Sequence, residues 1–211
     1  MNFLAHFHLA WPCADLISGG LEGDYYKGPL GADLPPGLAR GIHLHRSIDA
    51  YTDRHPLVAQ LRTLFPQALR RYAGILIDLS FDHYLSHHWS RYSDLPLEEF
   101  NRGVHDSLAS REHQLSANAR RMLGRLRDHN ILNLYHDWRT VTGSAARIGE
   151  RFRRGNPLLA VERELAHLRP ELERVFLEFY PDLQLASGRW QVELNQSSVP
   201  LSNIALSASS P

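Results

Sequence analysis

Apolar residues recur along most of the chain at the three- and four-residue spacing of amphipathic helices. Sustained alternation of apolar and polar residues, the pattern of half-buried strands, does not occur. The pattern therefore predicts an all-α protein of about seven to nine helices, folded as one helical domain over residues 1–185. The expected helical segments are 2–11, a turn or short helix within 12–23, 41–56, 57–73 with a break at Pro66, 75–92, 96–110, 116–128, 132–154, 157–170 and 171–180.

The last part of the chain has a different composition. From about Ala186 it becomes polar and rich in serine, which is typical of segments that cannot bury enough apolar surface to fold. We therefore expect residues 186–211 to form a disordered tail without a catalytic role.

Composition narrows the possible environments and partners. The 23 basic and 23 acidic residues cancel, so bulk affinity for nucleic acid is not indicated. No stretch approaches the roughly 20 apolar residues of a membrane span, and the start of the chain does not resemble a signal peptide. The lone Cys13 is compatible with a reducing compartment. These features predict a cytoplasmic protein that binds neither nucleic acid nor membrane.

Two helical stretches carry the residues best suited to chemistry. In 41–56, His45, Asp49 and Asp53 share one helix face beside an apolar stripe. In 75–89, Asp78 and Asp82 are four residues apart in apolar surroundings, and His83 follows directly. Carboxylates are costly to bury unless a positive charge lies between them. Because mixed carboxylate and imidazole ligands suit Mn, Fe, Zn or Mg, these faces predict a metal site.

Structural explanations exist for each of these patterns. The first face could be a solvated surface on which Arg46 and Arg54 pair with the carboxylates. His6, on the apolar segment 2–11, could be a core histidine rather than a ligand. Asp24 lies between glycines, where an aspartate also favours a turn.

Four separate blocks together resemble the acyl carrier protein phosphodiesterase family, in the same order and at the same spacing. They are MNFLAHFHLA (1–10), GDYYKG (23–28), GIHLHRSID (41–49, followed by Thr52 and Asp53) and DLSFDHYLSHHW (78–89). The likeness is strongest over residues 1–92. It implies an all-helical, divergent relative of the HD phosphohydrolases. It also implies Mn²⁺- or Mg²⁺-assisted hydrolysis of holo-acyl carrier protein to the apo-protein and 4′-phosphopantetheine. The functional positions that it implies are Asp24, His45, Asp49, Asp78, Asp82, His83 and His6.

The residue types suggest how such a reaction would proceed. A metal held by aspartate and histidine lowers the pKa of a bound water and neutralises phosphoryl charge. A carboxylate such as Asp49 or Asp82 could accept the proton of that water, and Asp24 is a further catalytic candidate. Lys27 and Arg46 are candidates to stabilise the phosphoryl oxygens. Sequence alone does not separate the ligands from the base.

The resemblance also implies an acidic protein partner, since acyl carrier proteins are small and strongly acidic. An arginine-rich helix could dock it through Arg120, Arg121, Arg125 and Arg127, and Arg151, Arg153 and Arg154 form a second candidate cluster. Solubilising surface charge is the alternative explanation. Two other functions stay open: an HD-type hydrolase of a nucleotide or another small phosphoester, and a non-catalytic helical binding protein.

Overall fold

The computed structural model describes residues 1–152, 155–159 and 161–196. All regular secondary structure in these residues is helical, which confirms the all-α class. They form ten α-helices, slightly more than expected, and three short 3-10 turns. The α-helices are α1 Phe3–Ala10, α2 Ala14–Glu22, α3 Pro36–Arg54, α4 Pro56–Thr63, α5 Ala73–His87, α6 Leu97–Ser110, α7 Ala117–Asp128, α8 Ile131–Leu134, α9 Arg139–Gly149 and α10 Val161–Gln196. The 3-10 turns are η1 Arg70–Tyr72, η2 Trp89–Arg91 and η3 Glu112–Gln114.

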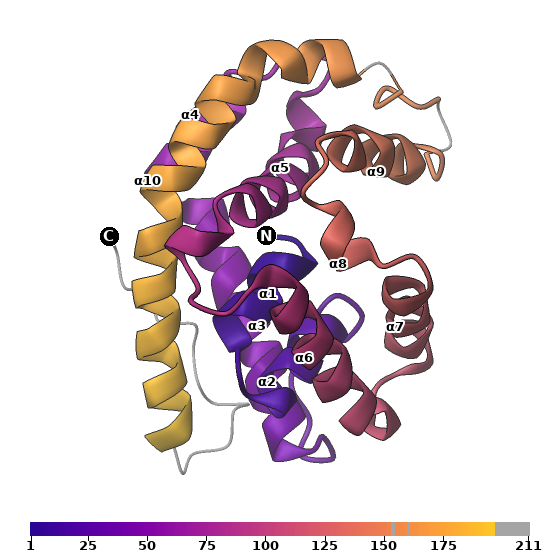
Figure 1. Ribbon diagram of the computed structural model, residues 1–211, viewed down its shortest axis with the longest axis vertical. Helices are drawn as coiled ribbons and strands as arrows, with labels where there is room; N and C mark the ends of the chain where they lie inside the picture. Colours follow the sequence, from indigo (N-terminus) through magenta and orange to yellow (C-terminus); the bar gives the residue numbers. More distant parts are fainter. Residues whose placement is uncertain (153–154, 160, 197–211) are drawn as a thin grey trace.

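Helices α1, α3 and α5 lie near the centre of the molecule, and α10 packs against them from one side (Figure 1). Phe7 of α1, Phe81 of α5 and Phe179 of α10 are completely buried there. The rings of Phe81 and Phe179 lie 5.6 Å apart between centroids. Burying a side chain of this size contributes about 1.5–3 kcal/mol, so aromatic packing helps to hold α5 and α10 together.

Helix α10 is a single helix of 36 residues along one side of the molecule (Figure 1). The sequence pattern predicted a boundary at Pro170 and an end at Tyr180. Both Pro170 and Pro181 lack the N–H of a regular helical hydrogen bond. The helix nevertheless continues, because Leu172 and Leu183 are buried beyond each proline. Neither α10 nor any other described helix is apolar over a stretch long enough to cross a bilayer.

The predicted tail boundary at residue 186 is corrected, because residues 186–196 form the last turns of α10. Ala186 is buried, and the Trp190 ring packs edge-on against Tyr51 of α3 with centroids 5.7 Å apart. Gln191 Nε2 donates a hydrogen bond of 2.9 Å to the carbonyl oxygen of Leu9. These contacts offset the polar composition of the segment. Residues 197–211, the rest of the predicted tail, lie outside the described part of the chain.

The crossing of α2 and α3 is unusually close. A Cβ atom on Gly19 of α2 would lie 2.3 Å from the Cα of Gly41 on α3, a distance that no side chain tolerates. The end of α2 is therefore pressed against α3. A Cβ on Gly23, just after α2, would likewise lie 2.4 Å from the His45 ring. The crossing thus determines where the loop that follows α2 meets the side of α3 that carries His45.

We expect Gly19→Ala to destabilise the fold by about 1–3 kcal/mol or more, because the added methyl meets backbone that cannot move aside. Gly124→Ala in α7 is a matched control, since a Cβ there meets nothing within 4 Å. Removing a helical glycine should stabilise that variant by about 0.5–1 kcal/mol. Urea denaturation measures both changes. If Gly19→Ala were as stable as the unmodified protein, the helices could not cross as closely as described.

Candidate functional site

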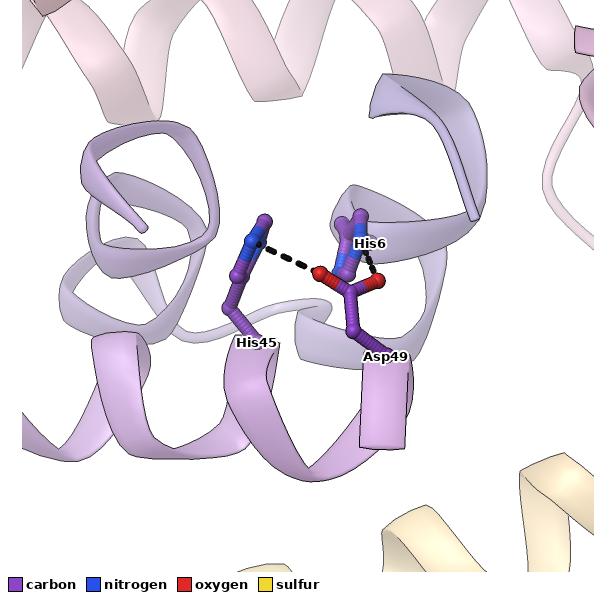
Figure 2. Close-up of side chains that lie close together, drawn as sticks. All are labelled: His6, His45 and Asp49. Carbon is purple, nitrogen blue, oxygen red and sulfur yellow. Dashed lines mark ion pairs between the residues drawn. The ribbon is translucent and has the colours of Figure 1, made fainter. Parts of the chain in front are cut away.

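The carboxylate of Asp49 on α3 faces two imidazoles, one from each of two helices (Figure 2). His6 Nε2 of α1 is 3.2 Å from Asp49 Oδ1, and His45 Nε2, one turn earlier on α3, is 3.1 Å from Asp49 Oδ2. The two rings are stacked, with centroids 4.1 Å apart and planes inclined by 20°. The structure thus brings together His45 and Asp49 of the first predicted face, and α1 adds His6 at the same point.

The electrostatics of this group favour a charged carboxylate and neutral imidazole. Burial alone would raise the pKa of Asp49, but the neighbouring His6 and His45 rings outweigh it and hold that pKa well below its usual range. Burial, aided by the His45 ring, lowers the pKa of His6 to about 4. At neutral pH Asp49 is therefore ionised and His6 is neutral, so the His6 ring can serve as a nitrogen donor to a cation.

The group has the composition and spacing of a metal-binding site. One ligand atom from each of His6, His45 and Asp49 lies within 4.8 Å of the others. Both ring nitrogens of His6 and Nδ1 of His45 are buried without a hydrogen-bond partner of regular geometry among the described residues. Leaving buried polar atoms in that state is costly. Two imidazoles and one carboxylate suit a divalent cation such as Mn²⁺, so these residues fit the metal that the sequence resemblance implies.

Asp78 of α5 reaches the same region through the amino group of Met1. That nitrogen donates a hydrogen bond of 2.9 Å to Asp78 Oδ1 and lies 3.4 Å from Asp49 Oδ1. Burial would lower the pKa of the amino group, but Asp78 and Asp49 raise it to about 11. Burial raises the pKa of Asp78, against the opposing effect of this positive charge. The two predicted faces, on α3 and α5, therefore meet at a buried ammonium group.

Asp82, one turn after Asp78, has a different environment. It is completely buried, and its two oxygens accept hydrogen bonds from the backbone N–H groups of Leu4 at 2.7 Å and Ala5 at 3.2 Å. Burial raises its pKa to about 7, although the two backbone donors act against this. The N-cap residue of α1, Asn2, makes no side-chain capping bond, so Asp82 supplies the acceptors instead. Asp82 thus caps α1 from a neighbouring helix.

His83 and Asp53 also lie apart from the group around Asp49. His83 Nδ1 is 2.8 Å from the carbonyl oxygen of Tyr135, and its ring stacks near that of His87 with centroids 5.9 Å apart. Asp53 is exposed on α3 and forms an ion pair with Arg62 of α4. The structure therefore gives His83 and Asp53 partners other than His6, His45 and Asp49.

An open pocket of about 440 Å³ lies beside His45 and Asp49. Its remaining wall comes mostly from the loop after α2, where Asp24 Oδ1 is 3.8 Å from His45 Nε2. Burial raises the pKa of Asp24. Arg46 Nη2 donates a hydrogen bond of 3.0 Å to the carbonyl oxygen of Tyr26, which ties this loop to α3. The pocket is lined by Gly23, Asp24, Tyr26, Lys27, Gly28, His45, Arg46 and Asp49.

The pocket unites five of the residues proposed from the sequence: Asp24, Lys27, His45, Arg46 and Asp49. Tyr26, Gly28 and the Met1 amino group were not among them. Gly28 has a φ of +85°, a conformation that favours glycine, and this allows the loop to turn back toward α3. The bracketing glycines of GDYYKG were the available signal for Gly28, whereas no sequence feature indicated the Met1 contact.

Residues 1–183 match the family model described as acyl carrier protein phosphodiesterase. Curated proteins of that name from Shigella boydii serotype 18 and Escherichia coli K12 are each 46% identical to this chain over 101 residues. The matched region is 47% of this chain and 52% of each relative, so the chain spans about half the length of the curated relatives that it matches. No solved structure matches the chain.

We expect Asp82→Ala to destabilise the protein by about 2 kcal/mol or more, because two buried N–H groups of α1 lose their acceptor. Asp82→Asn keeps one oxygen acceptor and should cost less. The control is Asp53→Ala, which removes an exposed carboxylate and should change stability by about 0.5 kcal/mol or less. Denaturant titration gives all three values, and wild-type stability of Asp82→Ala would exclude the capping role.

Proposed function

The chain belongs to the acyl carrier protein phosphodiesterase family, and from that premise we propose that it hydrolyses holo-acyl carrier protein. The bond cleaved belongs to the phosphodiester that joins a serine of the carrier protein to the pantetheine arm. Water is added, and the products are the apo-carrier protein and 4′-phosphopantetheine. The observation that carries the proposal is the family match over residues 1–183. The matched residues include Asp24, His45 and Asp49, which line one pocket together with two cationic side chains. A cytoplasmic location is part of the proposal.

The pocket suits a phosphodiester presented on the surface of another protein. It is open to solvent on one side, so a serine on a folded partner can approach it. Lys27 and Arg46 line it and can attract the anionic phosphoryl oxygens. Arg46 is already held by its hydrogen bond to the Tyr26 carbonyl, so its guanidinium loses less freedom when it binds an anion.

The other side chains have complementary roles in the proposal. His6, His45 and Asp49 would hold a divalent cation, and two imidazoles favour Mn²⁺ over Mg²⁺ as that cation. When bound, it would lower the pKa of a water molecule and neutralise phosphoryl charge. Asp24 is suited to accept a proton, because burial raises its pKa and it lines the same pocket. Asp82 would act by fixing α1, and hence His6.

The test is to incubate the purified chain with holo-acyl carrier protein and Mn²⁺ and to measure the carrier protein by mass spectrometry. We expect loss of the phosphopantetheine arm. Asp49→Asn, which keeps the side-chain shape, should reduce the rate by at least about a hundredfold. Changing a residue that only supports a metal ligand already lowers activity by up to about a hundredfold, and Asp49 is itself a proposed ligand. Asp53→Asn is the matched control and should retain full activity.

Two outcomes separate the parts of this proposal. If the carrier protein keeps its phosphopantetheine arm after incubation with the untreated enzyme and Mn²⁺, the reaction is not the one proposed. If cleavage continues at full rate after metal removal has been verified by elemental analysis, the reaction stands but the metal does not contribute to it.

A basic surface near the pocket is the proposed docking site for the acidic carrier protein. Arg125 and the other predicted arginines of α7 are exposed, opposite the buried Leu123 and Leu126. Burial raises the pKa of Tyr25, and the charges of Arg151 and Arg125 act against it. Because Tyr25 adjoins Asp24, these two arginines lie close enough to influence the pocket loop. The exposed set on α7 is Arg120, Arg121, Arg125 and Arg127; Arg153 and Arg154 of the second cluster lie outside the described residues.

We expect the double change Arg125→Glu and Arg151→Glu to raise the KM for carrier protein by about tenfold and to flatten its salt dependence. The rate at saturating substrate should change little, because neither residue lines the pocket. Arg163→Glu, which reverses the charge of an exposed residue on α10, is the control. Steady-state kinetics at several ionic strengths measure these effects, and an unchanged salt profile would remove this surface as the docking site.

A further inference from the structure

A second group of metal-ligating side chains lies where the end of α5 meets α10. His87 is the last residue of α5, His88 follows it as the C-cap, and Glu173 belongs to α10. One ligand atom from each lies within 4.8 Å of the others, and none of the three lines the pocket. We infer that these three side chains form a second metal site, which binds one late transition-metal ion such as Zn²⁺.

The two helices are held in register at this point. Tyr84 Oη of α5 donates a hydrogen bond of 2.9 Å to the carbonyl oxygen of Arg169 on α10. His88 and Glu173 each follow one helical turn later, four residues on, and His88 Nε2 is 2.7 Å from Glu173 Oε1. Because this contact and the two helices already hold His88 close to Glu173, little ordering is needed when an ion binds.

The end of α5 explains how two consecutive histidines can serve one ion. In a regular helix, consecutive side chains point about 100° apart around the helix axis. His88 has left the helical conformation, with φ −101° and ψ 23°, so its ring can lie closer to that of His87. The two ring centroids are 5.0 Å apart, with planes nearly perpendicular. The ring of His136 stacks on His87 with centroids 5.7 Å apart. The three side chains leave a fourth coordination position that water can fill.

The donor set indicates which ions this site takes. A Zn–N distance of about 2.0–2.1 Å in a tetrahedral site places neighbouring ligand atoms about 3.4 Å apart. The ligand atoms of His87, His88 and Glu173 all lie within 4.8 Å of one another, so small side-chain movements bring them to that spacing. Imidazole nitrogens favour Zn²⁺, Ni²⁺ and Cu²⁺ over Mg²⁺ and Ca²⁺. An ion here would link α5 to α10 and stabilise the folded state by mass action.

A simple ion pair between His88 and Glu173 is the competing explanation, and His87 distinguishes the two. The pair joins the helices without His87, whereas a three-ligand site requires it. His87 is exposed, so its removal should leave the fold intact. His129, exposed after α7, is a matched control for the loss of one surface imidazole.

The experiment titrates Zn²⁺ into untagged full-length Asp49→Asn protein, in which the pocket group is disabled, and measures heat. We expect one equivalent to bind and to raise the Tm. Adding His87→Ala should weaken binding by about tenfold or more, and Glu173→Gln should do the same, whereas His129→Ala should have no effect. In the protein with Asp49 intact, His87→Ala should lower the number of Zn²⁺ ions bound by one.

Circular dichroism verifies the fold of each variant. If the folded Asp49→Asn protein binds no Zn²⁺, or if folded His87→Ala binds it as tightly as its parent, His88 and Glu173 form an ion pair only and the proposal is overturned. The readout is Zn²⁺ binding alone, so the result is independent of the proposed phosphodiesterase activity.

Discussion

The Asp49 carboxylate and the two imidazoles that face it are the contact on which the rest of the site depends. His6 comes from α1 and His45 from α3, so the group exists only while these helices keep their relative positions. Two features maintain that arrangement: Asp82 caps α1 from α5, and the glycines at the α2–α3 crossing press the pocket loop onto His45. Residues that stabilise the fold therefore also set the geometry of the candidate site.

The acidic residues of α5 show how one helix face can serve two purposes. Asp78 and Asp82 are four residues apart and point toward the same segment, the first five residues of the chain. Asp78 meets the Met1 amino group, whereas Asp82 meets the backbone N–H groups of Leu4 and Ala5. Both carboxylates accept hydrogen bonds from donors at the start of the chain, where the dipole of α1 also favours negative charge. Only Asp78 shares its donor with Asp49.

The two histidine–carboxylate groups differ mainly in their access to water. His6 and His45 are buried beside the pocket, whereas His87 is exposed and His88 and Glu173 are half-buried. Burial strengthens electrostatic interactions and makes unpaired imidazole nitrogens costly, so the buried group depends more strongly on its partners than the exposed group does. The exposed group joins two helices at the surface, where an ion would contribute to stability rather than to chemistry in the pocket.

The sequence by itself determined the all-α class and the shared face of His45 and Asp49, because helical periodicity depends only on local spacing. It also indicated Asp24 through a family resemblance, and Lys27 and Arg46 through the positive charge that a phosphoryl group attracts. Tertiary structure alone decided that His6 completes the group around Asp49, that Asp82 caps α1 and that His83 turns to Tyr135. It also decided that α10 continues past residue 186, where Trp190 packs on Tyr51. These outcomes depend on contacts between helices far apart in the chain, which local patterns do not encode.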